Sequence, residues 1–310
     1  MAKVKYETFA EAKSRLFFDV KSTYYNLYFA AKAIRISEEN IGILSTFRSL
    51  ALIKVESGLA SSVDVLRAEM EIADIENQLA LLHDNFWALR TTFNNLLDVS
   101  GDAAITLPDT LVVPDVAFST EAALDSIRTG NHLILQSEYM EASFRKQELA
   151  AKKMGMPNFS VGFDYVFVGK SSNPMAPSSE SGKDAFVFPT IGLSIPIYRH
   201  KYTAMVKEAV LQQQSQGSER RDRINMLETA FAKTNKEYLD AVRRIPLYKE
   251  QSNKADRALG ILRTEYETSG KNFEEVLRIE RQLLQYELNI EKARSDKGAS
   301  VAFIGYLMGK

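Results

Sequence analysis

The sequence predicts a mainly α-helical protein of long antiparallel coiled-coil helices, with an internal duplication and one inserted β-hairpin. Three observations predict this fold class. Apolar residues recur at alternating steps of three and four along four long segments, a glycine break joins these segments in pairs, and two stretches between the pairs alternate strictly from residue to residue. An apolar spacing of 3.5 keeps one stripe of each helix facing a partner helix.

Each of the four helical arms is defined by its apolar seam. The seam residues are Phe17, Val20, Tyr24, Leu27, Ala31 and Ile34 in the first arm; Ile75, Leu79, Leu82, Phe86, Leu89, Phe93 and Leu96 in the second; Ile224, Leu227, Phe231, Thr234, Tyr238, Ala241, Ile245 and Tyr248 in the third; and Ile279, Leu283, Tyr286, Ile290 and Ala293 in the fourth. Gly58 lies between the first two arms and Gly270 between the last two. We therefore predict two helical hairpins.

The two hairpins match each other in order, which indicates an internal repeat offset by about 210 residues. An acid, a β-branched residue, Leu and Arg follow each glycine, at 64–67 and at 275–278. Each turn is expected to place its glycine at positive φ, and Ser61 or Ser62 and then Asn272 are expected to cap the next helix.

Between the hairpins the pattern changes. Residues 101–118, with Pro108 and Pro114, are expected to form an extended linker, and 121–154 resume a helical pattern that Pro157 ends. Residues 158–168 and 186–198 are predicted strands, and the Ser-, Pro- and Gly-rich stretch 170–185 is the predicted loop between them.

One face of the predicted hairpin is rich in aromatic and β-branched residues. On the first strand this face carries Phe159, Val161, Phe163, Tyr165 and Phe167, while the other face is small and polar. Alternation over about ten residues is typical of a transmembrane β-strand, although soluble hairpins packed on a helix are far commoner. Two strands cannot close a barrel, so the membrane interpretation requires oligomerisation.

Composition excludes several classes of protein. The net charge of −1 argues against a general nucleic-acid binder, and the absence of cysteine excludes disulfides and thiolate sites. His83, His132 and His200 lie far apart, so we expect no metal site, and no motif of a nucleotide-binding or hydrolytic enzyme occurs. We therefore expect neither an enzyme nor a cofactor.

Several motifs resemble those of the TolC-type outer-membrane efflux channels. "YETSG" (266–270) followed by "EEVLRIERQLLQYELN" resembles the Tyr-x-x-Gly and long-helix signature of that family, and "SGLASSVDVLRAEMEIADIENQL" is similar to its first-repeat counterpart. "PTIGLSIPIY" (189–198) resembles the family's second strand. The resemblance extends through nearly the whole chain, in the same order and spacing.

The resemblance implies a passive homotrimeric export duct in the outer membrane of a Gram-negative bacterium. A small β-barrel, to which the hairpin would contribute, would sit in outer-membrane lipid on a helical tunnel crossing the periplasm. The implied partners are further copies of the chain, a periplasmic adaptor protein and an inner-membrane transporter, which supplies the energy. No cofactor is implied.

The sequence departs from that family's pattern at its beginning. Residues 1–100 correspond to the second half of a first repeat, whereas 119–310 form a complete second repeat. The internal comparison predicts that about a hundred residues are missing, comprising a helix, two strands and a secretion signal. A trimer would then offer six strands, fewer than the usual minimum of about eight, so we expect no normal open barrel.

The resemblance places the glycine turns at the periplasmic tip of the channel. Gly58, Leu59, Gly270 and Tyr266 are the predicted adaptor-contact and tip-turn residues. Asp64 and Glu275 are aligned with acids that line the tip pore in some family members, and Arg67 and Arg278 follow three residues later. These four residues are candidate gate residues, or equally the ordinary surface pairs that such spacing favours.

A second hypothesis is a soluble, elongated coiled-coil scaffold that uses the hairpin as a binding edge. The two hypotheses differ in what the aromatic face contacts: lipid in the duct, and protein in the scaffold.

Overall fold

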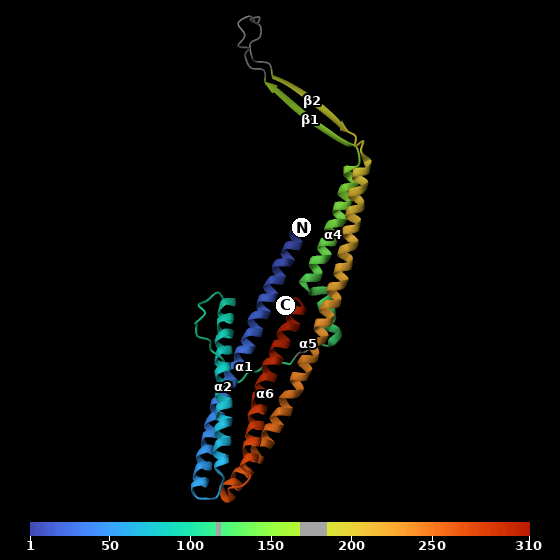
Figure 1. Ribbon diagram of the computed structural model, residues 1–310. Coiled ribbons are helices and arrows are strands. Elements are labelled where there is room, and N and C mark those ends of the chain that lie inside the picture. The colour runs from blue at the N-terminus through green and yellow to red at the C-terminus, as the bar shows by residue number, and fades with distance from the viewer. Residues whose placement is uncertain (116–118, 168–184) are drawn as a thin grey trace, which may run out of the picture. The chain divides into compact units, whose positions relative to one another are not determined.

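The computed structural model describes residues 1–115, 119–167 and 185–310, shown in Figure 1 as long helices and one pair of strands. The helices are α1 (Ala2–Glu56), α2 (Ser62–Leu96), α3 (Thr120–Gly130), α4 (His132–Met154), α5 (Arg199–Ser269) and α6 (Phe273–Leu307); the strands are β1 (Asn158–Phe167) and β2 (Ala185–Ser194). The predicted fold class is confirmed. Of the predicted loop 170–185, only Ala185 is among the described residues.

The chain forms two compact units. The hairpin unit contains residues 6–135 and 223–310 and holds both helical hairpins, while the strand unit contains residues 1–5 and 136–222 and holds the strand pair. Both hairpins lie in one unit, so the compact units do not follow the predicted boundaries at 100 and 119. The division into two repeats stays a prediction.

The repeat prediction agrees with the lengths of the second helix of each hairpin. Helices α2 and α6 are both 35 residues long, and they begin at Ser62 and Phe273. Each follows a turn whose glycine has positive φ, +72° at Gly58 and +67° at Gly270.

Burial follows the predicted seams in α2 and α5. In α5 the buried residues Leu227, Phe231, Thr234, Tyr238 and Ala241 recur at steps of three and four, as predicted. In α2 every predicted seam residue is buried or half-buried, while most residues between them are exposed. The stripe that faces neighbouring helices was therefore readable from spacing alone.

The predicted seam of α1 is wrong at its beginning. Phe17 is 49% exposed, and the neighbouring Phe18 instead packs on Phe303 and Tyr306 of α6, at ring-centroid distances of 5.0 and 5.8 Å. Further along α1 the buried stripe passes through Ala30 and Ala33, each one residue before the predicted Ala31 and Ile34. It then continues past the predicted seam through Ser37, Asn40, Leu44, Phe47 and Ala51. Its small and polar members conceal it from a search for apolar residues.

The predicted helix 121–154 is interrupted at Asn131. The Asn131 side chain accepts from the Leu133 N–H and donates to the Leu307 carbonyl oxygen, at 3.0 and 2.9 Å, so it satisfies backbone groups on both α4 and α6. Close by, α3 packs Ala123 and Ile127 into an apolar cluster with Phe231 of α5 and other residues of α6.

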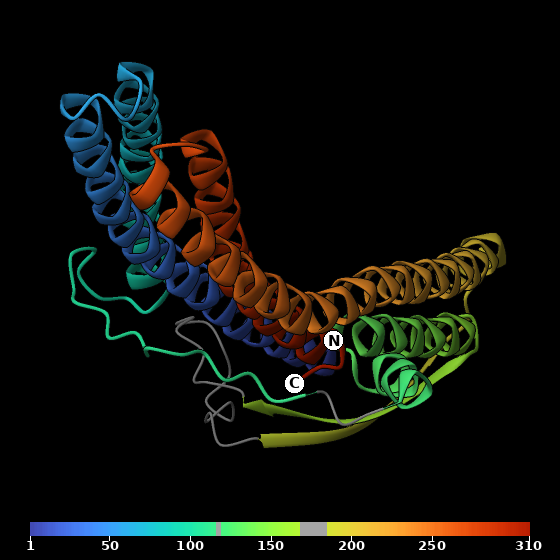
Figure 2. The same cartoon turned by 90° about the horizontal axis from the view of Figure 1, so that it is seen from below.

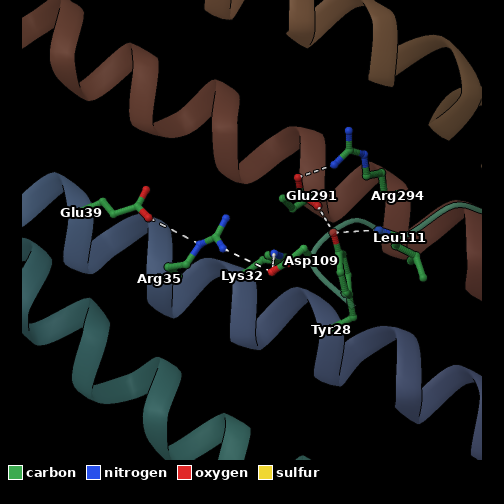
Figure 3. Close-up of polar contacts among 8 residues, drawn as sticks. All are labelled: Tyr28, Lys32, Arg35, Glu39, Asp109, Leu111, Glu291 and Arg294. Atoms are coloured by element: carbon green, nitrogen blue, oxygen red, sulfur yellow. Dashed lines mark hydrogen bonds and ion pairs between the residues drawn. The ribbon is translucent and has the colours of Figure 1, made fainter. Parts of the chain in front are cut away.

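Residues 101–115 lie outside the helices and strands, and polar contacts hold them to the helices. Figure 3 shows the Tyr28 hydroxyl donating to Glu291 and accepting from the Leu111 N–H, at 2.7 and 3.1 Å. Lys32 and Arg35 of α1 lie 3.9 and 3.8 Å from Asp109. Because Asp109 is 98% exposed, these ion pairs add little to the stability of the fold. The hydrogen bonds of the buried Tyr28 contribute more to holding the linker in place.

Strands β1 and β2 form one antiparallel pair in which Asn158 lies opposite Ser194 and Phe167 opposite Ala185. The second strand was predicted to extend to Tyr198 but ends at Ser194. Beyond Ser194, β1 offers no further partner, since Pro157 precedes its first residue, and Pro196 has no N–H to donate. No helix in the described part of the chain combines the length and apolar character needed to cross a membrane.

Candidate functional site

Two tight turns form one end of the hairpin unit. At the first, the Gly58 N–H donates to the Val55 carbonyl at 2.9 Å and the Leu59 N–H to the Lys54 carbonyl at 2.8 Å, which is the Schellman pattern that ends a helix. The Ser61 side chain then caps α2 by accepting from the Val63 N–H at 3.2 Å. The predicted turn and cap are confirmed.

The second turn differs from the prediction at Asn272. The Gly270 N–H donates to the Tyr266 carbonyl at 2.9 Å, which is the simpler helix ending with one residue at positive φ. Asn272 also has positive φ, and its side chain donates to Glu265 at 2.7 Å and makes no capping bond to α6. The left-handed backbone turns its side chain away from the N–H groups that it was expected to cap.

The two turns pack directly against each other. Both views of the hairpin unit, Figures 1 and 2, place the α1–α2 turn beside the α5–α6 turn. Gly270 is buried, and a Cβ added there would lie only 2.9 Å from the carbonyl carbon of Leu59. The Lys54 ammonium donates to the Glu267 carbonyl across the same junction. We call this contact the tip junction.

An apolar core lies directly under the tip junction. It contains Phe47 of α1, Ala68 of α2, Tyr266 of α5, and Phe273 and Val276 of α6, together with other residues of these helices. The rings of Tyr266 and Phe273 are 4.7 Å apart. All four helices therefore contribute to one core, which stabilises the two hairpins as a unit.

A buried carboxyl and a buried hydroxyl lie within this core. Asp64 is 7% exposed and Tyr266 is 1% exposed. Burial raises the pKa of Asp64, opposed by the positive charge of Arg67. Burial, followed by the negative charge of Asp64, raises the pKa of Tyr266 to about 12. Within the described residues the Tyr266 hydroxyl has no hydrogen-bond partner, so Asp64 acts on it across the two hairpins through its charge.

The candidate gate residues form ion pairs. Arg67 lies 3.4 Å from Asp64 and 3.0 Å from Glu274, so it joins α2 to α6. Arg278 donates to Glu275 of its own helix at 2.9 Å. The surface-pair geometry is therefore present at both positions, and one arginine also bridges the hairpins.

Exposure separates the predicted tip residues into two groups. Gly58 and Leu59 lie on the surface, and the Leu59 side chain is 52% exposed. Gly270 and Tyr266 are buried in this chain.

The strand pair leaves its aromatic-rich face exposed. Phe159, Val161, Phe163 and Tyr165 are between 67% and 75% exposed, and the β2 residues opposite them continue the same face. The β2 members Val187, Ile191 and Leu193 are 60%, 82% and 55% exposed. The side chain of Phe167 lies outside what the structure describes. A contiguous exposed apolar face of this kind marks an interaction surface.

The histidines do not form a site. His132 lies 2.8 Å from Glu7, in an isolated contact between α4 and α1. Among the residues that the structure describes, no three His, Cys, Asp or Glu side chains are grouped as a metal ion requires.

Sequence reasoning missed contacts between the hairpins. Arg281 of α6 pairs with Glu71 of α2 through Nε at 3.1 Å, and Asn40 of α1 donates to Glu280 of α6 at 2.7 Å. Asn40 and Glu280 are buried but lie outside the seams predicted from apolar spacing. Because both residues are polar, a search for apolar positions gave no signal for this contact.

No protein-family model matches the sequence, and no curated protein does. Solved structures match the fold. The outer-membrane channel OprN is 16% identical with a TM-score of 0.85, covering 99% of this chain and 68% of its own. The outer membrane protein VceC of Vibrio cholerae is 13% identical with a TM-score of 0.83, and the match covers 99% of this chain and 72% of VceC. The CmeC outer membrane channel of Campylobacter jejuni is 13% identical with a TM-score of 0.75, and the match covers 99% of this chain and 65% of CmeC. The resemblance inferred from the sequence is thus confirmed for the fold.

Proposed function

We propose that this chain, which has the fold of the TolC-type outer-membrane channels, is a component of a passive export channel in the outer membrane of a Gram-negative bacterium. The proposed role is transport and not catalysis. The observation that carries it is the exposed apolar face of the strand pair, combined with long paired helices whose two turns pack together at the tip junction.

The length of the strands β1 and β2 supports contact with lipid. Each strand has 10 residues, within the range of about 9 to 11 that spans a bilayer as a tilted strand. The aromatic-rich face is apolar, while the opposite face, which is also exposed, carries Ser160, Gly162 and Asp164 on β1 together with Val166 and Phe188. A scaffold would require another protein to cover the apolar face.

Assembly into a homotrimer is the finer part of the proposal. A lone strand pair leaves two edges whose N–H and C=O groups lack partners, and in lipid each such group costs several kcal/mol. Strands from further copies of the chain would satisfy these edges.

The tip would receive a periplasmic adaptor, which connects the channel to an inner-membrane transporter. Gly58 and Leu59 are the proposed surface contacts because they are exposed. Gly270 and Tyr266 are buried and would support this contact indirectly, by holding the second turn against the first.

The experiment compares Phe163→Lys with Asp164→Lys. These neighbours lie on opposite faces of β1, so the two variants add the same residue to the proposed lipid face and to the proposed inner face. A lysine on the lipid face costs about 2 to 4 kcal/mol near the bilayer centre, which predicts at least about a tenfold smaller membrane-bound fraction for Phe163→Lys in vesicle flotation. The Asp164→Lys variant should float like the wild type. Equal flotation of all three proteins would contradict the proposal.

A further inference from the structure

A cavity of about 340 Å³ lies among α1, α2 and α6 within the hairpin unit, away from the tip turns. Its wall is mainly polar: Asn40 comes from α1, Glu71, Asp74 and Gln78 from α2, and Glu280 and Arg281 from α6. Arg281 is the only cation among the lining residues that the structure describes, and it pairs with Glu71.

Two buried oxygen atoms of this wall accept no hydrogen bond. The Asn40 amide donates to Glu280 Oε1 at 2.7 Å, but within the described residues Asn40 Oδ1 and Glu280 Oε2 have no partner. The two residues are 5% and 1% exposed. A buried acceptor left without a donor is costly, so this pair of oxygens favours a ligand that brings N–H or O–H groups.

The charges around the cavity specify a cation. Glu280 and Asp74 are carboxyls that Arg281 does not bind directly, and Glu287 of α6 and Asp256 of α5 add negative charge near Glu280. A metal ion fits less well than an ammonium, because no group of three metal-ligating side chains occurs in the described residues. An ammonium supplies three N–H donors and one positive charge.

We propose that this cavity binds a small organic diamine, with one ammonium donating to Asn40 Oδ1 and Glu280 Oε2 and the other near the Asp74 carboxylate. The site is distinct from the tip and from the strand pair, so it does not depend on the proposed export role.

Proton release accompanies this binding. Burial, followed by the negative charge of Glu287, raises the pKa of Glu280 to about 7, with Asp256 adding to the rise and the Asn40 bond opposing it. The empty site therefore holds a proton on Glu280 through much of the range below neutral pH. An ammonium stabilises the ionised carboxylate, so the affinity should increase as pH rises through about 7.

The experiment titrates the purified full chain with 1,4-diaminobutane by calorimetry at about pH 6 and about pH 8. The diamine stays protonated at both values, so roughly tenfold tighter binding at the higher pH reports ionisation of Glu280. Glu280→Gln should weaken binding at least about tenfold at the higher pH and remove the pH dependence. Asp74→Asn, an exposed change that leaves the core intact, should weaken binding severalfold and keep the pH dependence.

Two controls make the result specific. Glu287→Gln removes a half-buried acid of α6 that does not line the cavity but raises the pKa of Glu280, so it should bind the diamine more tightly than Glu280→Gln does and should move the pH dependence to lower pH. The neutral analogue 1,4-butanediol should not bind. Absence of diamine binding to the wild type, equal binding of butanediol, or equal losses in Glu280→Gln and Glu287→Gln would each overturn the proposal. None of these outcomes bears on membrane flotation, so the export proposal is tested separately.

Discussion

At the scale of single residues, the two turn glycines share a backbone conformation but differ in their surroundings. Gly58 and Gly270 have φ of +72° and +67°. A Cβ at Gly58 would meet nothing within 4 Å, whereas at Gly270 it would collide with the Leu59 backbone. Positive φ explains why each turn contains a glycine, and the tip junction adds a second requirement at Gly270 only.

This difference predicts unequal costs for the same substitution. Gly58→Ala should lower the free energy of unfolding by about 1 kcal/mol, the strain of a left-handed alanine. Gly270→Ala adds a backbone clash and should cost at least about 2 kcal/mol more, because the turns must separate. Urea unfolding of both variants measures this, and equal losses would show that the tip junction is not tight.

Glu280 makes stability depend on pH. Its pKa in the folded chain is raised to about 7 from an ordinary value of 4.5, so the folded state binds a proton that the unfolded state releases. The contribution of this residue is therefore complete below about pH 4.5 and is lost as pH rises towards 7.

Glu280→Gln tests this sign. The amide keeps the shape and cannot ionise, so the variant should gain about 1 to 3 kcal/mol relative to wild type between about pH 5 and pH 8. Thermal unfolding at several pH values measures the difference between the two proteins. A constant difference across that range would contradict the assignment.

At the scale of elements, spacing predicted the buried face of some helices and could not predict the partner of any. In α5 the predicted apolar seam is the buried stripe, and in α2 it is the less exposed face. In α1 the stripe passes through Ser37 and Asn40, which a search for apolar residues overlooks. Asn40 belongs there because its amide faces Glu280 of α6, a contact between residues 240 positions apart.

The α1–α2 turn is the element proposed to contact an adaptor. Leu59→Asp should reduce capture of the adaptor by at least about tenfold, since it places a charge in the centre of an apolar contact. Leu52→Asp is a matched control, because Leu52 is also exposed on α1, at 48%, and lies about one helical turn before the end of that helix. Pull-down with the purified adaptor measures both, and equal capture by the two variants would contradict a role for Leu59.

At the scale of the whole molecule, the ion pairs near the tip are proposed to keep the channel closed. Arg67 bridges α2 to α6, and Arg278 holds Glu275 in place. In a symmetric assembly each pair would be repeated once per chain, so the loss of one arginine would act at every copy.

Arg278→Ala should therefore raise the basal conductance of the assembled channel in planar bilayers severalfold, because an unpaired ring of Glu275 carboxylates repels itself. Arg145→Ala removes a comparable i,i+4 pair, with Glu141, far from the tip in sequence, and serves as the control. An unchanged conductance in Arg278→Ala would assign the pair to ordinary helix stabilisation.

The sequence by itself determined the long helices, the two glycine turns, a serine cap at 61 or 62 and the alternating strands. Each of these follows from local spacing and from the backbone preferences of single residues. Only the tertiary structure decided that Phe18 and not Phe17 meets α6, that Asn272 does not cap, that Gly270 touches Leu59, and that Glu280 is buried beside Asn40. The physical reason is that spacing defines a face of a helix, whereas the rotation and height at which two helices meet are set by packing between residues far apart in the chain.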